Sequence, residues 1–361
     1  MYIGSEAKHY VYGIKGRTAV DEAIKSIGLV LAQMLAELKA GYAPHPVYQT
    51  VERLFDDNYH IQCADETDGD SEAIEPKANQ ELGAGALQSL DDLEATFRSK
   101  AGESYQGYVA NISESCDDEN DVQLIVKVQV ESNNVDDAAM LVAALPDLAE
   151  RTEVEIMYTD GGYGSAEVDH LMNEHQVEQI QSAIRGRAPD PNKLTLADFV
   201  IEQDADGRPT HLTCPQGQRV AIESGRTTGF LARFDPDICA DCPLQLADRC
   251  RAKPQKRNPR FTLGFTQEEV FQAQRRRRHR EFRRTPGNPR AGVEATVRSV
   301  KHPFRQGKLP VRGHFRVTCM VIASAAMCNV RRIQRYLAQK GPWRHFFSPF
   351  FAYSPPSAPL T

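Results

Sequence analysis

Apolar residues recur with a helical period in the first part of the chain. From Asp21 on they are spaced by three or four positions, which predicts an amphipathic helix. They are Ile24, Ile27, Leu31, Met34, Leu35 and Leu38. Pro44 and Pro46 end this helix, and a second helix is expected over residues 47–57. Residues 65–81 are acidic and poor in apolar side chains, which predicts a surface loop.

The middle of the chain changes to a pattern typical of strands. Residues 107–113 and 122–130 are expected to form an antiparallel hairpin, because a short polar link joins them. A helix over residues 135–148 and a strand over residues 154–158 follow. Residues 177–184 are a further candidate strand. This succession of elements indicates an α/β fold.

Asp160 follows the strand expected at residues 154–158 and precedes Gly161 and Gly162. α/β folds bind ligands at the carboxyl ends of their strands, and glycines let a ligand approach the backbone closely. Asp160 is therefore a candidate catalytic and metal-binding residue. The alternative is a structural aspartate in a turn that leads into two glycines.

A single helix is expected between Pro289 and Pro303, because proline fits the first turn of a helix and also ends one. At 3.6 residues per turn, Arg290, Glu294 and Lys301 share one face of it. A carboxylate between two cations can bind a metal ion while the cations hold phosphate. The alternative is a solvated helix with ion pairs between its turns.

A run of arginines precedes that helix. Thr266 and Glu269 match a capping box, which predicts the start of another helix leading into the run. The candidate DNA-contacting residues in it are Arg275, Arg276, Arg277, Arg278 and Arg280. Such a run suits the phosphate backbone of nucleic acid, and the alternative is a solvated surface. Residues 317–330 are expected to form a buried helix further on.

The charge is distributed unevenly, although the net charge of the 361 residues is only −6. From Cys214 on there are 28 basic and 9 acidic residues, which leaves 15 basic and 40 acidic residues before it. A basic portion of this size favours a polyanionic partner. No apolar stretch is long enough to span a bilayer, and no signal peptide is recognisable, so a cytoplasmic protein is expected.

Four of the eight cysteines are clustered in the sequence. They are Cys214, Cys239, Cys242 and Cys250. The Cys-x2-Cys pair within the set favours a structural Zn²⁺ ion, and the alternative is buried or redox-active thiols. Zinc would explain how a polar stretch of this length is ordered. A hairpin of residues 198–203 and 210–213 is expected just before it, around a turn rich in Asp, Gly and Pro.

Four segments carry motifs that can be compared with a known family. They are Tyr105-Gln-Gly-Tyr108, Val128-x-Val130-Glu131-x-Asn133-Asn134-x-Asp136-Asp137, Tyr158-Thr-Asp160-Gly-Gly-Tyr163-Gly-Ser165 and Arg290-x3-Glu294-x6-Lys301. In this order, over roughly residues 1–340, they resemble bacterial insertion-sequence transposases with a DDE-type catalytic domain. The family's tyrosine three residues before the arginine is Gly287 here. The cysteine-rich insertion is typical of one branch of these transposases.

The resemblance implies a particular α/β fold. Its expected parts are an RNase H-like mixed sheet with flanking helices, a helical insertion near the N-terminus and a small zinc-ribbon-like insertion. The implied divisions are a remnant of the first core strand (1–20), a helical insertion and acidic loop (21–100), core strands with Asp160 (101–213), the cysteine-rich insertion (214–265), a basic helical part of the core with Glu294 (266–345) and a flexible tail (346–361).

The resemblance also implies a function. Members of the family transpose DNA by metal-dependent cleavage and strand transfer, so Asp160 and Glu294 are expected to bind Mg²⁺ or Mn²⁺. DNA at the element ends and at the target is the expected partner, together with a second copy of the chain on that DNA. The expected location is the bacterial cytoplasm, in association with the nucleoid, without contact to a membrane.

The family's first catalytic aspartate has no counterpart in this sequence. It belongs to an Asp-Ser or Asp-Thr pair on the first core strand, expected here at residues 3–12, where the chain has Gly4-Ser5. The chain is therefore expected to be truncated before this strand and impaired in catalysis. Asp117 or Asp118 could substitute only from a hairpin turn. The alternatives are a non-catalytic DNA-binding remnant and an RNase H-like nuclease.

Overall fold

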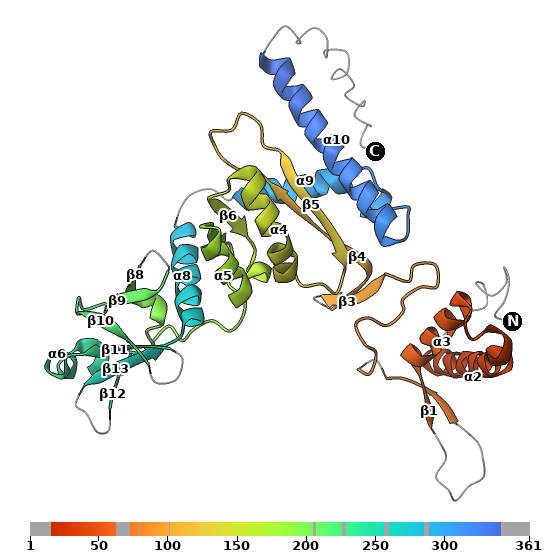
Figure 1. Ribbon diagram of the computed structural model, residues 1–361, viewed down its shortest axis with the longest axis horizontal. Helices are drawn as coiled ribbons and strands as arrows, with labels where there is room; N and C mark the ends of the chain where they lie inside the picture. Colours follow the sequence, from red (N-terminus) through yellow and green to blue (C-terminus); the bar gives the residue numbers. More distant parts are fainter. Residues whose placement is uncertain are drawn as a thin grey trace, which may run out of the picture. The chain divides into compact units, whose positions relative to one another are not determined.

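The computed structural model describes most of the chain (Figure 1). The described residues are 16–62, 73–78, 80–100, 102–204, 207–225, 229–255, 260–284 and 289–340. The strand expected at residues 3–12, Gly4-Ser5, Gly287 and the tail from residue 346 lie outside them, as does the side chain of Arg290. The chain forms two compact units. Unit 1 comprises Met1–Ala110, Val130–Val135 and Leu309–Met320, and unit 2 comprises Asn111–Gln129, Asp136–Lys308 and Val321–Thr361.

Unit 1 starts with two helices and a small sheet. The elements are α2 (Arg17–Tyr42), α3 (Pro46–Asn58) and the antiparallel strands β1 (Tyr59–Gln62) and β2 (Ala73–Pro76). Both predicted helices are confirmed, and their core contains Leu35, Phe55 and Tyr59. The loop expected over residues 65–81 is wrong in part, because β2 lies within it. Ile74 of β2 is buried in the same core, and the strand pairs with β1 along its whole length.

The remainder of unit 1 includes β3 and the first part of β4, which belong to a second sheet. Strand β3 (Thr96–Lys100) pairs antiparallel with β4 (Glu103–Glu114). Tyr108 on β4 donates a hydrogen bond of 2.6 Å to Asp92 Oδ1, and the backbone amide of Gly313 donates one of 2.9 Å to Asp92 Oδ2. Asp92 thereby joins β4 to the segment around Gly313, a residue 221 positions away.

The predicted hairpin is divided between the two units, and unit 2 contains a parallel pair of strands. β5 (Ile125–Ser132) is the neighbour of β4, which confirms the hairpin. β6 (Ile156–Thr159) runs parallel to β7 (Glu178–Gln181), and both were predicted. The helix between the hairpin and β6 is α4 (Asp137–Thr152), and the helix between β6 and β7 is α5 (Ala166–Glu174). Leu145 of α4 and Val168 of α5 are completely buried in a core that both helices share.

The cysteine-rich region is part of a six-stranded sheet of antiparallel strands. In spatial order the strands are β12 (Lys253–Pro254), β13 (Phe261–Phe265), β11 (Phe230–Phe234), β10 (Arg219–Ser224), β9 (Pro209–Thr213) and β8 (Val200–Gln203). Three short helices accompany it: η2 (Leu196–Asp198), α6 (Pro236–Ala240) and α7 (Pro243–Leu246). The hairpin of β8 and β9 is confirmed.

This sheet has an apolar core of its own. Phe199, Leu212, Phe234 and Leu263 are almost completely buried in it. The region therefore differs from the small polar insertion that the cysteines suggested, because alternating apolar residues on several short strands already provide a core. A zinc-ribbon-like insertion is not shown.

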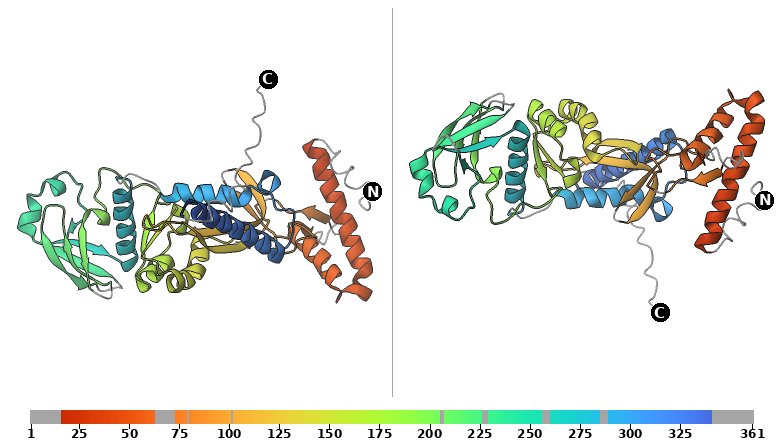
Figure 2. Two further views of the ribbon diagram at one scale, coloured as in Figure 1. Left: turned by 90° about the horizontal axis from the view of Figure 1, so that it is seen from above. Right: turned by 90° about the horizontal axis from the view of Figure 1, so that it is seen from below.

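Three longer helices follow, and all but the start of the last one belong to unit 2. They are α8 (Gln267–Phe282), α9 (Pro289–Lys301) and α10 (His314–Lys340), with the short helix η3 (Arg305–Gly307) between the last two. The capping box of α8 is confirmed, since Glu269 N donates to Thr266 Oγ1 at 3.3 Å and Thr266 N donates to Glu269 Oε2 at 3.1 Å. Figure 2 shows α9 beside α10, and Ser324 Oγ of α10 donates to Val300 O of α9 at 2.7 Å.

The last predicted helix is longer and more amphipathic than expected. It was predicted as a buried helix over residues 317–330, but it continues to Lys340, and Ile322, Met327 and Val330 are exposed. Because the apolar run in the sequence is nearly continuous, its pattern does not indicate which residues face the core. Within the described part of the chain, no helix has the length and apolar character needed to cross a membrane.

Gly28 and Gly41 of α2 provide a matched pair for testing the core of unit 1. A Cβ at Gly28 would lie 2.6 Å from Cδ1 of buried Tyr59, whereas a Cβ at Gly41 would meet nothing within 4 Å. We predict that Gly28→Ala lowers the free energy of unfolding by about 1–3 kcal/mol through overpacking. Gly41→Ala should leave it unchanged or raise it by up to about 1 kcal/mol through helix propensity. Urea unfolding followed by circular dichroism measures both, and equal effects would contradict the packing argument.

Candidate functional site

The turn that follows β6 carries Asp160. Its carboxylate Oδ1 accepts a hydrogen bond of 2.7 Å from the amide of Gly162, at the start of the short helix η1 (Gly161–Tyr163). The turn leads directly into α5, whose first amides are capped by Ser165. Asp160 is thus held in a defined orientation at the carboxyl end of β6, where the sequence placed it.

Three glycines of this turn are closely approached by other segments. A Cβ at Gly161 would lie 2.9 Å from the carbonyl oxygen of Ala183, on the chain that leaves β7. A Cβ at Gly162 would lie 2.7 Å from Asp137 Oδ2 and 2.9 Å from Asp160 Oδ1, and one at Gly164 would overlap the guanidinium of Arg275. Since Cβ atoms are essentially never closer than 3.0 Å to a backbone oxygen, glycine is required at Gly161, whereas a side chain at Gly162 or Gly164 would force neighbouring side chains to move.

Glu294 lies on α9, which runs against β6. Thr296 and Val300 lie on the buried face of α9, whereas Glu294 and Lys301 are exposed. The strand that precedes Asp160 and the helix that carries Glu294 are therefore neighbours, although 134 positions separate the two acids in the sequence. That the two carboxylates meet at one metal site remains a prediction.

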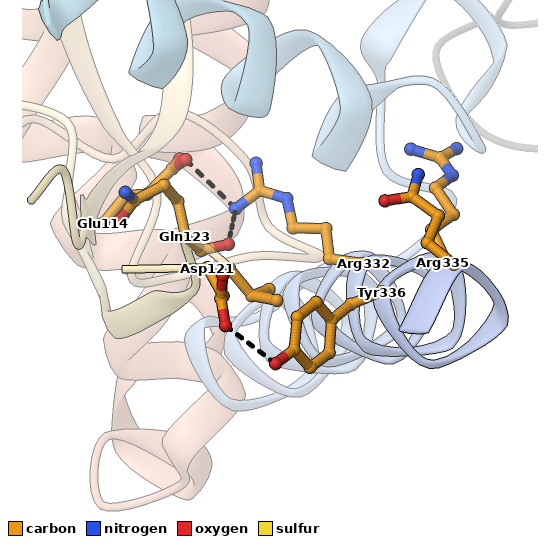
Figure 3. A pocket seen from close by; sticks show the side chains of 8 residues that line it. Glu114, Asp121, Gln123, Arg332, Arg335 and Tyr336 are labelled. Atoms are coloured by element: carbon orange, nitrogen blue, oxygen red, sulfur yellow. Dashed lines mark hydrogen bonds and ion pairs between the residues drawn. The ribbon is translucent and has the colours of Figure 1, made fainter. Parts of the chain in front are cut away.

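Arg332 of α10 holds α9 to the hairpin of β4 and β5 (Figure 3). Its guanidinium forms a 3.0 Å ion pair with Glu114, whose side chain is only 8% exposed, and donates to the carbonyl oxygen of Gln123 at 3.0 Å. It also donates to the hydroxyl of buried Thr296 on α9. Arg332 lies beside a cavity of about 310 Å³ that is lined by Glu114, Asp121, Val122, Gln123, Arg332, Arg335, Tyr336 and Gln339. These contacts fix the position of the helix that carries Glu294.

Three of the five predicted DNA-contacting arginines of α8 form ion pairs. Arg275 lies 3.2 Å from Asp169, Arg278 lies 3.0 Å from Glu178, and Arg280 lies 2.6 Å from Asp198. Neither Arg276 nor Arg277 is fully exposed. Burial lowers the pKa of Arg276, and the nearby Arg280, Arg275 and Arg251 lower it further. Three of the five side chains thus have their charge balanced within unit 2, and their contact with DNA remains a prediction.

Asp169 and Arg275 lie in a buried polar interior behind the turn. Asp169 is 7% exposed, and Gln179 and Gln181 of β7 are 2% exposed. Asp169 Oδ2 and Arg275 Nε have no hydrogen-bond partner, so the pair is held by charge and not by an aligned hydrogen bond. Burial therefore dominates and raises the pKa of Asp169 to about 6, against the opposing effects of Arg275, His170 and Arg278.

The four clustered cysteines lie around one end of the six-stranded sheet. Cys239 is buried in its core, and Cys214 and Cys250 pack against the same core. Cys242 follows α6, and its amide donates to the carbonyl oxygen of Cys239 at 3.3 Å. Burial, together with the nearby Cys242, Cys250 and Cys214, raises the pKa of the Cys239 thiol to about 11. These side chains are free thiols, and zinc binding by them remains a prediction.

The described side chains do not form a complete metal-binding site. Across the described ranges, no three His, Cys, Asp or Glu side chains are grouped so that they could hold a metal ion. The turn after β6 nevertheless offers oxygen donors, which are the ligands that Mg²⁺ prefers. Mg²⁺ is often bound by only one or two carboxylates, with water and phosphate as its other ligands. The residues around Asp160 therefore fit a hard divalent cation.

Comparison with family models gives a match to part of the chain. The family model described as the transposase DDE domain matches residues 213–334. The matched segment contains all four clustered cysteines, α8, Glu294 on α9 and Arg332 on α10. The match supports a transposase, and DDE transposase domains generally use a divalent metal ion such as Mg²⁺. The comparisons with curated proteins and with solved structures give no match.

Three residues of the site were not singled out by the sequence. Asp137, Asp169 and Arg332 depend on contacts with residues far away in the chain. The sequence contained a signal only for Asp137, which belongs to an Asp-Asp pair at the start of the predicted crossover helix. An acid in the first turn of a helix is common on electrostatic grounds, so this signal was not specific.

Asp169 should make stability depend on pH in an unusual direction. A carboxyl group whose pKa rises from 3.8 to about 6 on folding stabilises the fold below pH 4, and this contribution is lost as the pH rises through 6. We predict that the unfolding free energy of the wild type falls, relative to Asp169→Asn, by up to about 3 kcal/mol between pH 4 and pH 7. Urea unfolding at a series of pH values measures the difference.

Asp248 provides the control for this titration. The pKa of Asp248 is lowered to about 2 by Lys193 and Lys253, so Asp248→Asn should differ from the wild type by a constant amount between pH 5 and pH 7. Parallel stability curves for the wild type and Asp169→Asn would show that burial does not perturb Asp169.

Proposed function

We propose that this chain is a DNA-acting protein of the DDE transposase class. The reaction of this class is metal-dependent cleavage of DNA followed by strand transfer, with Asp160 and Glu294 as the acids in this chain. The observation that carries the proposal is that α9, the helix of Glu294, packs against β6, the strand that precedes Asp160. The DDE family model matches the region that contains α9. An RNase H-like core is the fold that this proposal implies.

The residues of the chain have separate roles in this proposal. A divalent metal ion, Mg²⁺ or Mn²⁺, would supply activation of the attacking oxygen and stabilisation of the leaving oxygen. Asp160 is oriented for binding it by the amide of Gly162, and Glu294 projects from the exposed side of α9. Lys301 is exposed on the same helix and would contact the DNA backbone. Arg290, by its position one turn before Glu294, would do the same.

We also propose that catalysis by this chain is impaired. The family's first catalytic aspartate corresponds to Gly4, which cannot bind a metal ion through its side chain. Loss of one acid from a two-metal site removes several kcal/mol of transition-state stabilisation. DNA binding does not need this acid, so the chain would keep its affinity for DNA and lose most of its reactivity.

Restoring the acid tests this proposal. We predict that Gly4→Asp increases Mn²⁺-dependent cleavage by at least about a hundredfold, on a duplex carrying the DNA that flanks the coding sequence. Adding Asp160→Asn to this variant should abolish the gain. All three proteins should bind the duplex with similar affinity, and that affinity should fall steeply with salt. Cleavage by the wild type that survives Asp160→Asn, or the absence of any DNA binding, would contradict the proposal.

A structural zinc ion at Cys214, Cys239, Cys242 and Cys250 is a separate proposal. It is supported by the Cys-x2-Cys pair and by the packing of Cys214, Cys239 and Cys250 against one core, and zinc would bind the four side chains as thiolates. We predict one zinc ion per chain in protein purified without chelator, measured by atomic emission. Cys242→Ser should reduce the zinc content, while Cys319→Ser, at an exposed cysteine of α10, should not. A zinc-free protein that remains folded would contradict this proposal.

A further inference from the structure

Strand β7 carries two buried glutamines beside the turn of Asp160. β7 pairs in parallel with β6, so that Gln179 lies opposite Met157 and Gln181 lies opposite Thr159. Each glutamine is only 2% exposed. Buried positions of parallel strands usually carry apolar residues, because an amide loses its water when it is buried and needs hydrogen bonds in exchange. The partners of these amides therefore indicate what the glutamines do.

The side chain of Gln179 bonds to both sides of the turn. Its Nε2 donates to Thr159 Oγ1 at 3.1 Å and to the carbonyl oxygen of Tyr163 at 3.4 Å. Thr159 directly precedes Asp160 and is itself 7% exposed, and Tyr163 is the last residue of η1. A carbonyl oxygen can only accept, so the amide nitrogen of Gln179 faces the turn. One buried side chain thus connects the two ends of the segment that presents the Asp160 carboxylate.

Stability alone does not explain an amide at this position. Gln179 Oε1 is buried and, among the described residues, has no hydrogen-bond partner. A buried acceptor without a partner destabilises a fold, whereas an apolar side chain of similar length would avoid that cost. An apolar side chain could fill the same space, but it could not connect the two ends of the turn. What the amide adds is a fixed geometry of the turn.

We propose that Gln179 is a positioning residue for Asp160. By holding Thr159 and Tyr163, it fixes the turn in which Asp160 Oδ1 accepts from the amide of Gly162 at 2.7 Å. The inference rests on the proposed function, under which this carboxylate binds a divalent cation. A carboxylate that is already oriented loses less conformational entropy when it binds the ion. Gln179 does not bind the ion itself and acts through the turn.

Hydrogen–deuterium exchange of the full-length chain tests whether Gln179 holds the turn. Gln179→Met keeps the length of the side chain and removes its donor, so the amides of residues 160–164 should exchange at least about fivefold faster through local opening. Gln129→Met is the matched control, because the Gln129 amide donates to the carbonyl oxygen of Met140 at 2.8 Å instead. The turn should exchange in this control as in the wild type. Amides of the six-stranded sheet report global unfolding and should be unchanged in both variants.

A double-mutant cycle tests the route of the effect. Thr159→Val removes the acceptor of one of the two hydrogen bonds and keeps the shape of the side chain. If Gln179 acts through this bond, Thr159→Val and Gln179→Met together should accelerate the exchange of the turn no more than Gln179→Met alone. Effects that multiply would show that the two side chains act independently, and they would overturn the inference.

Mn²⁺ binding connects the turn to the proposed function. By isothermal calorimetry, Gln179→Met should bind Mn²⁺ about tenfold more weakly than the wild type, since a metal ligand loses affinity when its support is removed. Gln129→Met should bind it like the wild type. In the Gly4→Asp chain, Gln179→Met should lower kcat for cleavage and leave the KM for DNA unchanged, because the proposed DNA contacts lie on α9.

The outcomes separate this inference from the proposed function. Unchanged exchange of the turn in Gln179→Met would overturn the inference and leave the proposed role of Asp160 intact. So would faster exchange without loss of Mn²⁺ affinity, and equally faster exchange in the six-stranded sheet would mean that Gln179 only stabilises the fold. A wild type that binds no Mn²⁺ would contradict the proposed function, and the exchange experiment would still decide whether Gln179 holds Asp160 in place.

Discussion

Close packing around the turn from Asp160 to Gly164 is the constraint on which the candidate site depends. Helix α4, the chain leaving β7 and helix α8 each approach this turn at a different glycine. A side chain at Gly161 would displace the backbone that leaves β7, and one at Gly162 or Gly164 would move the side chains of Asp137 or Arg275. Because the glycines of this turn have no side chains, Asp160, the start of α4 and the guanidinium of Arg275 can lie close to it.

Arg332 imposes the corresponding constraint on α9. Burying the nearly inaccessible Glu114 with this arginine requires the removal of water from both groups, which offsets much of their attraction. The further contacts of the guanidinium, with the carbonyl oxygen of Gln123 and the hydroxyl of Thr296, satisfy donors that would otherwise be lost. Because all these partners are fixed, the arrangement favours one position of α9, and this determines where Glu294 stands.

The sequence predicted those parts of the fold that depend on local patterns. Helices α2, α4 and α8 followed from apolar spacing and caps, and the place of Asp160 followed from the end of a strand. Strand β2 was missed because its buried residue, Ile74, stands in an otherwise polar stretch. The surroundings of the candidate site were missed for a different reason. Asp137 meets Asp160 only through α4 packing on η1, and apolar spacing does not reveal which helix end meets which turn.

The uneven charge of the chain has a meaning that its sequence alone did not reveal. The acidic first part supplies partners for the basic second part within unit 2: Asp169 for Arg275, Asp198 for Arg280 and Glu114 for Arg332. A run of arginines therefore need not mark a surface for DNA, since acids that are distant in sequence can balance it.

The cations that follow Glu294 are more exposed than most of those on α8, where only Arg280 of the five predicted arginines is exposed. Arg298, Lys301, Arg305 and Lys308 are all exposed. Exposed cations can replace the counterions of DNA phosphates without first breaking an internal ion pair. Under the proposed function, the charge that meets DNA would then be concentrated beside the catalytic helix α9, and the arginines of α8 would serve mainly to hold α8 against α5, β7 and η2.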